Sequence, residues 1–331
     1  MQLNRKVLVT GGAGYIGSHV VRQLGEAGYD IVVYDNLSTG FAEAVLCGEL
    51  VVGDTGDFDR LCQLFKKYQF DAVLHFAASL VVSESVQRPL DYYANNTLNT
   101  LNLLRCCELF EVKKLVFSST AAVYGEPKQV PVREDAPTNP INPYGRSKLM
   151  SEWMIQDLAK TSDLRYVILR YFNVAGAEPE GRLGQRTPNA THLIRMACDA
   201  ALGRRSHLEI YGTDFDTPDG TGIRDFIHVE DLASAHLSAL SYLEAGHESQ
   251  ILNCGYGKGY SVREVAECVQ EVSGKEFDVV EIGRRSGDPA CVTANVDKIS
   301  SNLDWEPRYL ELGGMVRSAL SWERRLLSGQ R

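Results

Sequence analysis

The sequence predicts an α/β fold, in which a doubly wound parallel sheet is joined to a second, smaller α/β domain. Three observations lead to this prediction. Short β-rich runs alternate with helical patterns from Lys6 to Phe172, which is typical of a parallel sheet covered by helices on both faces. A glycine-rich turn joins the first strand pattern to the first helix pattern. The alternation loosens after Asn173, and 331 residues are too many for one ordinary core.

The elements of the first half follow from apolar periodicity. Strands are expected at Lys6–Thr10, Ile31–Tyr34, Leu50–Val52, Asp71–Ala78, Lys114–Ser119 and Arg165–Phe172. Helices are expected after the glycine turn, around Leu61–Phe65, over Pro89–Phe110 and from Pro143 onward. Parallel strands end at one edge of their sheet, and ligands bind beyond that edge. One crevice should therefore collect the residues at the strand ends, which are Asp35, Asp54, Ala77, Ser119, Thr120 and Asn173.

The second half contains shorter elements and more loops. Loops are expected at Glu178–Ala190 and Asp214–Gly222, strands at Glu209–Tyr211 and Arg224–Val229, and helices at His192–Ala201 and Glu230–Leu243. Two further strand–helix pieces close the chain. We expect a first domain over residues 1–175, with residues 224–254 packing back onto it, and a smaller second domain over residues 176–331.

The glycine turn has the spacing of a dinucleotide-binding turn. Gly12, Gly14 and Gly17 fit Gly-x-Gly-x-x-Gly, while Gly11, Gly14 and Gly17 fit the wider Gly-x-x-Gly-x-x-Gly. Such glycines let a pyrophosphate approach the N–H groups at a helix N-terminus. Asp35 ends the next strand, and a carboxylate there binds a ribose diol and repels a 2′-phosphate. The sequence therefore predicts a Rossmann-type domain that binds NAD in preference to NADP.

A candidate general base lies in the helix that begins at Pro143. Tyr144 and Lys148 are four residues apart and so share one helix face. An ammonium nearby favours a phenolate and lowers the pKa of a tyrosine, which is otherwise near 10. Tyr124 and Lys128 have the same spacing, but Pro127 lies between them and cannot occupy a helix interior.

Composition excludes several classes of function. The net charge of −9 argues against a general nucleic-acid binder, and no apolar run reaches the ~20 residues of a membrane span. Because a strand pattern begins by Val7, we expect no signal peptide. The eight cysteines form no Cys-x-x-Cys pair and the histidines show no metal-ligand spacing, so we expect reduced thiols, no metal and a cytoplasmic location.

With these motifs placed, the chain resembles the extended short-chain dehydrogenase/reductase family, and within it the UDP-glucose 4-epimerases. The resemblance runs from Lys6 to about Trp322. It is carried by the stretches Thr10–Ser18, His75–Ala78, Asn95–Asn96, Phe117–Thr120, Tyr144–Lys148, Arg170–Asn173, Gly220–Val229 and Arg285–Asp288. The family implies that the first domain binds NAD and the second binds a UDP-sugar.

The resemblance also implies the roles of individual residues. Tyr144 would be the catalytic base, supported by Lys148 and Thr120. NAD would be held by Gly11, Gly14, Tyr15, Ile16, Gly17, Asp35, Asn36, Asp54, Phe76, Ala77, Ala78, Asn95, Ser118, Tyr144, Lys148 and Phe172. The UDP-sugar would be held by Thr120, Tyr144, Asn173, His192, Leu193, Tyr211, Arg224, Arg285, Asp288 and Val292. The residue types suit these roles, because arginines can clamp a diphosphate and a tyrosine face can pack against uracil.

Three positions depart from the pattern of the family. Leu80 stands where some epimerases have a lysine near the cofactor, His192 where an asparagine is often found, and Thr120 where many members have serine. Thr120 keeps the hydroxyl, so its implied role survives. The position four residues after Asp288 is beside the sugar ring in the epimerases, and here it is Val292, or Cys291 if the register shifts by one. A small residue there predicts that N-acetylated UDP-hexosamines also fit.

The resemblance implies an isomerase that interconverts UDP-glucose and UDP-galactose by transient oxidation at carbon 4 with bound NAD. A 4,6-dehydratase would need an acid pair after the hydroxyl residue, where this chain has Ala121 and Ala122. Two alternatives stay open: a 4-epimerase of UDP-xylose/UDP-arabinose or UDP-glucuronate, and a non-catalytic NAD-sensing regulator. The family also implies a homodimer formed through the helices near residues 96–110 and 144–158.

Overall fold

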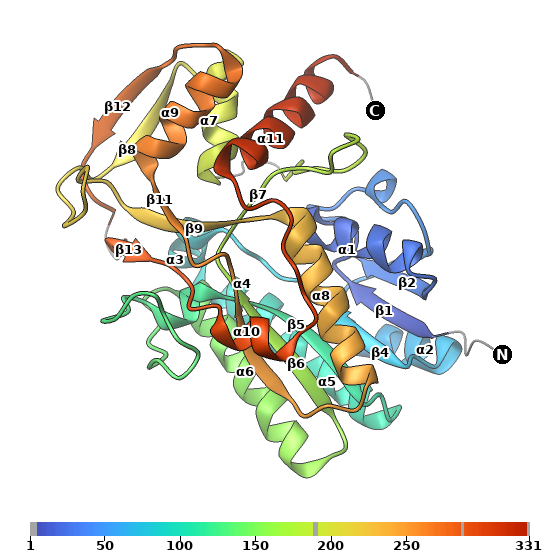
Figure 1. The fold of residues 1–331 in the computed structure, drawn as a ribbon. Coiled ribbons are helices and arrows are strands. Elements are labelled where there is room, and N and C mark those ends of the chain that lie inside the picture. The colour runs from blue at the N-terminus through green and yellow to red at the C-terminus, as the bar shows by residue number, and fades with distance from the viewer. Residues whose placement is uncertain (1–4, 188–190, 286–287, 330–331) are drawn as a thin grey trace.

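A seven-stranded parallel sheet forms the centre of the molecule (Figure 1). The computed structural model describes residues 5–187, 191–285 and 288–329. Across the sheet the strands follow the order β10 (Gln250–Cys254), β6 (Arg165–Tyr171), β5 (Lys114–Thr120), β4 (Ala72–His75), β1 (Lys6–Thr10), β2 (Asp30–Asp35) and β3 (Glu49–Val52). The predicted doubly wound parallel sheet is therefore confirmed.

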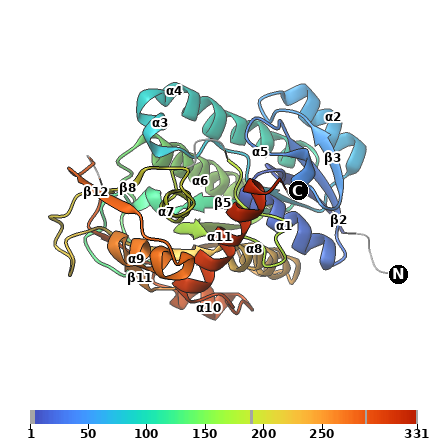
Figure 2. The same cartoon turned by 90° about the horizontal axis from the view of Figure 1, so that it is seen from above.

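Helices cover both faces of this sheet, as Figures 1 and 2 show. One face packs against α1 (Tyr15–Glu26) and α8 (Val229–Glu244), and the other against α2 (Phe58–Tyr68), α5 (Asn99–Leu109) and α6 (Pro143–Thr161). The strand residues alternate between the two cores: Val7 and Val9 lie in the first, and Leu8 lies in the second. This is the period of two that a strand buried on both faces requires.

The strand order reverses at β1, and this reversal positions the site. The chain runs outward from β1 through β2 to β3, then returns to β4 on the other side of β1. The connections that leave β1 and β4 therefore diverge at the carboxyl edge of the sheet, where a crevice opens in folds of this kind. The glycine turn follows β1, and Phe76–Ala78 follow β4 at the same edge.

Two elements differ from the sequence prediction. The strand expected at Asp71–Ala78 ends at His75, because the next residues turn out of the sheet and Ala77 lies against Gly11. The single helix expected over Pro89–Phe110 is interrupted: α4 (Pro89–Tyr92) leads into a π-helical segment, η2 (Tyr93–Leu98), before α5 begins. Such wide turns often lie at functional sites, and this one contains Asn95 and Asn96.

The second lobe is built from two small sheets and three helices. In the first sheet β9 (Ile223–His228) pairs with β7 (Asn173–Ala175), β11 (Gly259–Ser261) and β13 (Cys291–Val292); in the second, β8 (His207–Tyr211) pairs with β12 (Asp278–Ile282). Their helices are α7 (Leu193–Ala201), α9 (Val262–Ser273) and α11 (Leu312–Leu327), which share one core. Short helices α3 (Val82–Gln87) and α10 (Asp297–Asn302) and the 3₁₀ turns at Ala42–Ala44 and Ala121–Tyr124 complete the elements.

The segment 224–254 is divided between the two lobes. Helix α8 and strand β10 pack on the main sheet, whereas β9 lies in the smaller sheet of the second lobe. The division of the chain at residue 175 stays a prediction. The loop predicted at Glu178–Ala190 has no helix or strand in its described part, and residues 188–190 lie outside the described residues. Among the described helices, none has the length and apolarity needed to cross a membrane.

Candidate active site

The glycine turn leaves space in front of the N-terminus of α1. A Cβ on Gly11 would lie 2.5 Å from the Ala77 nitrogen, and one on Gly17 would lie 2.3 Å from the Gly11 oxygen, so packing requires both glycines. Gly14 differs, because its added Cβ would meet only the Gly11 oxygen, at 3.3 Å. No side chain caps the helix at Gly14. The first N–H groups of α1 therefore face a space that suits a pyrophosphate.

Acidic and amide side chains gather beside this turn. The Asp35 carboxylate is 7 % exposed and accepts hydrogen bonds from the backbone N–H of Ala13 at 2.9 Å and of Leu37 at 2.8 Å. Burial raises the pKa of Asp35, and the two backbone donors act against this shift. Asn36 donates to the Asp54 carboxylate at 2.7 Å. Asp35, Asn36 and Asp54, predicted separately from the sequence, thus lie at one end of the crevice.

The remaining residues predicted to hold NAD lie at or near the carboxyl edge of the sheet. The Phe76 N–H donates to the Thr10 carbonyl at 2.9 Å, and Asn95 donates to the Ser79 hydroxyl at 2.9 Å. The Ser118 hydroxyl bonds the Tyr171 hydroxyl at 2.9 Å. The Ala77 backbone lies against Gly11 of the glycine turn, and Ala78 is the next residue in the chain. Phe172 is buried just after β6.

Tyr15 and Ile16 direct their side chains into the protein. The Tyr15 hydroxyl donates to the Gly176 carbonyl at 2.6 Å, and the Ile16 side chain packs on the core beneath the sheet. Any contact that these two residues make with a pyrophosphate would therefore come from their backbone N–H groups.

Tyr144, Lys148 and Thr120 converge at the carboxyl end of β5. Pro143 is the first residue of α6, and the Asn142 side chain caps the helix by accepting from the Gly145 N–H at 2.9 Å. Tyr144 is 9 % exposed and Lys148 is 4 % exposed. Thr120 is the last residue of β5, and its hydroxyl oxygen accepts from the Ala122 N–H at 3.1 Å. Tyr144 thus bonds Thr120, and the Lys148 ammonium is buried one helical turn away over the Phe117 ring.

Burial controls the protonation of this group. Burial raises the pKa of Tyr144, although a hydrogen bond with Thr120 acts to lower it. Burial also lowers the pKa of Lys148 to about 7, and the charge of Glu152 acts against that shift. The sequence predicts that Lys148 lowers the pKa of Tyr144. In the protein alone, the loss of water dominates because it disfavours both the phenolate and the ammonium, and the hydrogen bond with Thr120 opposes it at Tyr144.

The second pair with the same spacing has a different environment. Tyr124 ends a 3₁₀ turn, and Gly125 follows it in the left-handed region with φ 67°. The Tyr124 hydroxyl donates to Asn253 at 2.7 Å and accepts from Arg170 at 3.0 Å. The prediction that Tyr124 and Lys128 do not share a helix is confirmed, and Tyr124 has a structural role.

The residues predicted to hold a nucleotide diphosphate are already paired with one another. Arg224 on β9 donates to the Asp288 carboxylate at 2.7 Å. The Arg285 guanidinium lies 3.4 Å from the centre of the Tyr211 ring. The Tyr211 hydroxyl donates to Glu209 at 2.6 Å. The fold therefore brings all four residues to one edge of the second lobe, and Arg285 covers one face of Tyr211.

Val292 lies where the second lobe meets α6. It pairs in register with Arg224, is 8 % exposed, and packs in a cluster that includes Phe172 and Leu149. Leu149 directly follows Lys148 on α6. Val292 thus lies beside Arg224 in its sheet and packs in one cluster with Leu149 of the helix that carries Tyr144.

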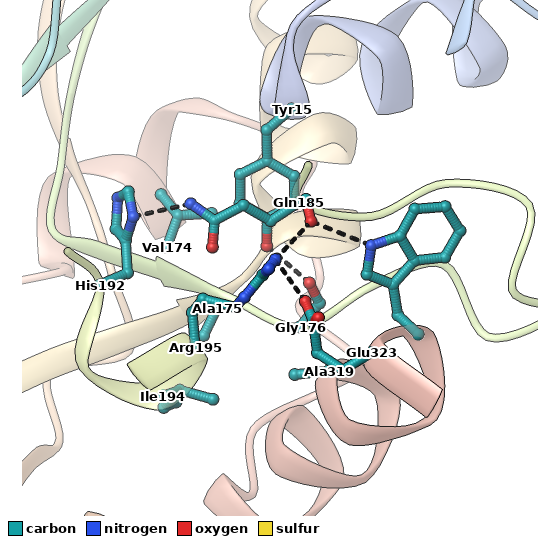
Figure 3. A pocket seen from close by; sticks show the side chains of 11 residues that line it. Tyr15, Val174, Ala175, Gly176, Gln185, His192, Ile194, Arg195, Ala319 and Glu323 are labelled. Atoms are coloured by element: carbon teal, nitrogen blue, oxygen red, sulfur yellow. Dashed lines mark hydrogen bonds and ion pairs between the residues drawn. The ribbon is translucent and has the colours of Figure 1, made fainter. Parts of the chain in front are cut away.

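His192 borders a small cavity between the two lobes (Figure 3). Its Nδ1 lies 2.7 Å from the side-chain nitrogen of Gln185, which donates to it. Burial and then the charge of Arg195 lower the pKa of His192, so the ring is neutral and its proton is on Nε2. His192 immediately precedes α7, Leu193 is the first residue of that helix, and Asn173 begins β7 near the same cavity.

The sequence did not assign functions to several buried polar residues that support the site. Glu152 and Arg170 form a fully enclosed ion pair at 2.6 Å, one helical turn beyond Lys148. The Asn96 amide donates to the Ser79 carbonyl at 2.9 Å and to the Ser147 hydroxyl at 3.0 Å, and so ties α6 to the segment after β4. The available sequence signal is a charged or amide side chain within an otherwise apolar pattern.

His75 is another buried polar residue below the crevice. Its two ring nitrogens lie 2.6 Å from the Thr10 hydroxyl and 2.9 Å from the Thr100 hydroxyl. Burial and then the charge of Lys148 lower the pKa of His75 to about 3, so the ring is neutral at physiological pH. His75 therefore connects β1, β4 and α5 without carrying charge.

Comparison with known proteins identifies the family of this chain. The model of the NAD dependent epimerase/dehydratase family matches residues 7–255. A UDP-glucose 4-epimerase of Azospirillum brasilense is 58 % identical over 322 residues, covering 97 % of this chain and 92 % of the relative. A crystal structure of UDP-glucose 4-epimerase from Brucella ovis in complex with NAD superposes with a TM-score of 0.93 at 45 % identity, covering 96 % of this chain and 98 % of that one.

A second solved structure is of an epimerase named for two UDP-sugars. The UDP-Glc/GlcNAc 4-epimerase of Campylobacter jejuni superposes with a TM-score of 0.86 at 49 % identity, covering 97 % of this chain and 99 % of that one. The family model matches residues 7–255, the relative and the two solved structures cover nearly the whole chain, and the predicted resemblance is confirmed. The chain belongs to the NAD dependent epimerase/dehydratase family.

Proposed function

We propose that this protein interconverts UDP-glucose and UDP-galactose by inverting carbon 4 of the sugar. The observation that carries the proposal is the hydrogen bond between Tyr144 and Thr120, with Lys148 buried one helical turn away, at the carboxyl edge of a sheet whose glycine turn suits NAD. NAD, the cofactor of the family, supplies the oxidation at carbon 4 and its reversal. The residues of this chain then have to bind, orient and move a proton.

Tyr144 is the proton acceptor and donor in this proposal. It takes the proton of the sugar's 4-hydroxyl and later returns it, while the Thr120 hydroxyl bonds the same sugar oxygen. Because burial raises its pKa in the protein alone, Tyr144 needs positive charge nearby to become a phenolate. Lys148, on the same helix face, and an oxidised nicotinamide ring supply that charge. The base is therefore fully active only in the cofactor-loaded protein.

The nucleotide end of the substrate is held by the second lobe. Arg224 and Arg285 are the two cations suited to a diphosphate, with Asp288 beside them as an acceptor for a ribose hydroxyl. Arg285 would leave the ring of Tyr211 for the diphosphate, which frees that face for uracil. Asn173, His192 and Leu193 complete this end, and the Nε2–H of His192 is a donor that stays uncharged.

The sugar pocket also accepts N-acetylated UDP-hexosamines in this proposal. Val292 is small, lies beside Arg224 and packs in one cluster with Leu149 of α6, where a larger residue would reduce the space for a 2-acetamido group. The Campylobacter jejuni relative is described as a UDP-Glc/GlcNAc 4-epimerase, which supports a pocket of this kind.

The direct test is to incubate the purified protein with UDP-galactose and to separate the products. We expect UDP-glucose to form without net change in NADH absorbance, and Tyr144→Phe to abolish most of the activity. UDP-xylose and UDP-glucuronate, assayed in parallel, identify the preferred sugar. Release of NADH would indicate a dehydrogenase, and a protein that binds NAD but turns over no UDP-sugar would indicate a regulator.

We also propose that the protein is a homodimer. Leu98, Leu101, Met150 and Trp153 are exposed apolar side chains on η2, α5 and α6, and a groove lies between these helices. Leu101→Glu would place a charge in this interface, and sedimentation should then detect a monomer. Leu310→Glu, at an exposed leucine outside these helices, is the matched control and should leave the dimer intact.

A cytoplasmic location is the last part of the proposal. All eight cysteines are free thiols, which suits a reducing compartment. Fractionation of the native cells tests it, and recovery of the protein outside the cytoplasmic fraction would contradict it.

A further inference from the structure

A contact between two distant segments lies beside the glycine turn. The Arg186 guanidinium lies 3.9 Å from the centre of the Phe41 ring, in the geometry of a cation–π contact. Phe41 belongs to the segment that follows β2 and Asp35. Arg186 belongs to the segment that follows β7, in the part of the chain that leads into the second lobe.

The segment of Phe41 is held directly on the glycine turn. The Phe41 N–H donates to the Ala13 carbonyl at 3.0 Å, and Asp35 accepts from the Ala13 N–H at 2.9 Å. A Cβ on Gly40 would lie 2.8 Å from the Ala13 carbonyl carbon, so the two stretches of backbone are in contact. Phe41 therefore extends from the rim of the space in front of α1.

The segment of Arg186 is fixed on the opposite side. The Tyr15 hydroxyl bonds the Gly176 carbonyl at 2.6 Å. The Gln185 carbonyl accepts from the Trp322 indole at 3.0 Å and from Arg195 at 2.9 Å (Figure 3). In Figures 1 and 2 the yellow-green segment after β7 lies beside the blue segment around α1. Arg186 thus reaches Phe41 from an anchored position.

Arg186 also carries a charge that the described residues do not pair. Arg182 on the same segment bonds Glu178 at 2.6 Å, whereas Arg186 takes part in none of the ion pairs formed within the described ranges. Its guanidinium lies over an aromatic ring next to a space that suits a pyrophosphate. A cation in this position attracts a bound dinucleotide.

We propose that Arg186 and Phe41 form a clasp across the adenosine–pyrophosphate end of the NAD cleft, and that the clasp slows release of the cofactor. This inference rests on the proposed position of NAD along the glycine turn. Retention matters for an epimerase, because a cofactor lost in mid-cycle leaves an oxidised sugar that cannot be reduced. A cation–π contact at a partly exposed position corresponds to about a two- to fivefold change in release rate.

The test measures the release of NAD and not turnover. Native protein, Arg186→Met, Phe41→Leu and the double variant are loaded with radiolabelled NAD, and loss of label is followed in excess unlabelled NAD. We expect release about two- to fivefold faster in each single variant. The double variant should be no faster than the faster single variant, because both changes open the same clasp. Arg105→Met is the matched control, since Arg105 lies 4.0 Å from the Phe58 ring on α2 and α5.

The possible outcomes separate the clasp from the function on which it rests. Native-like release in Arg186→Met overturns the clasp, and so do additive effects of the two changes or equally fast release in Arg105→Met. Thermal unfolding of each variant shows whether faster release reflects a damaged fold. A native protein that binds no labelled NAD overturns instead the proposed position of the cofactor.

Discussion

Lys148 lies one helical turn from Tyr144, and its ammonium nitrogen is 4.4 Å from the centre of the buried Phe117 ring. The ammonium is therefore enclosed by the sheet and not directed to solvent. This explains why its pKa falls to about 7, since the interior disfavours the charge more than Glu152 favours it. Because this pKa is close to physiological pH, a bound cofactor or substrate can change whether Lys148 is charged.

The lowered pKa of Lys148 should make the stability of the cofactor-free protein depend on pH above neutrality. The folded pKa is below the unfolded value near 10.5, so between about pH 7 and 10.5 the unfolded chain binds more protons. The contribution of Lys148 to the free energy of unfolding therefore increases with pH over this window. Urea unfolding at pH 7 and 9 should show a more positive pH dependence in native protein than in Lys148→Met. Equal pH dependences would contradict the depressed pKa.

Removing the hydroxyl group of Tyr144 should remove the proton acceptor and change little else. Tyr144→Phe keeps the ring in its buried place, so the fold and NAD content should stay unchanged. Turnover of UDP-galactose should fall about 100-fold to 10,000-fold, the usual contribution of a general acid–base group. Near-normal turnover would exclude Tyr144 as the base.

Tyr124→Phe is the matched control and should reduce the stability of the protein without reducing its turnover. Loss of its hydroxyl removes one buried hydrogen bond from Arg170 and one from Asn253, which should cost about 1–3 kcal/mol in the free energy of unfolding. Turnover per folded molecule should stay close to that of the native protein. A large loss of turnover in the folded variant would mean that this hydroxyl group also serves the chemistry.

Asp35 should make the protein selective for NAD. Its buried carboxylate lies at the end of β2, where it repels a 2′-phosphate. Acid extraction of the purified protein should release NAD(H) and not NADP(H). Asp35→Asn removes the charge and keeps one of the two acceptor oxygens that bond Ala13 and Leu37, and it should reduce the preference for NAD over NADP. An unchanged preference would place the selectivity in another residue.

Val292 should control access of N-acetylated sugars. In Val292→Tyr, turnover of UDP-N-acetylgalactosamine should fall more than that of UDP-galactose, because a tyrosine fills the space for the acetamido group. Both activities are measured in native protein and in the variant, and thermal unfolding detects overpacking of the cluster around Phe172.

Cys291→Tyr provides the control for Val292, because neighbouring residues of a strand point to opposite faces. This substitution should not discriminate between the two sugars. If the native protein has no activity on the acetylated sugar, or if Val292→Tyr lowers both activities equally, Val292 does not control access.

The sequence by itself determined those features that depend on local order along the chain. Strand–helix alternation specified the parallel sheet, since each period fixes which faces are buried. The glycine turn and Asp35 are joined by a single helix and strand, and Tyr144 and Lys148 by one helical turn, so their relative positions follow from secondary structure alone. The failures at Asp71–Ala78 and Pro89–Phe110 lie where tertiary contacts bend an element away from its local preference.

Only the tertiary structure decided which distant residues meet and how each is charged. Arg224 meets Asp288, Arg285 covers Tyr211, and Arg186 reaches Phe41, across separations that no periodicity encodes. The spacing of Tyr144 and Lys148 reports a neighbouring charge but not the loss of water around the phenol, which raises the pKa of Tyr144 in the protein alone. Burial is a property of the whole packed chain, and it determines the protonation states on which the chemistry depends.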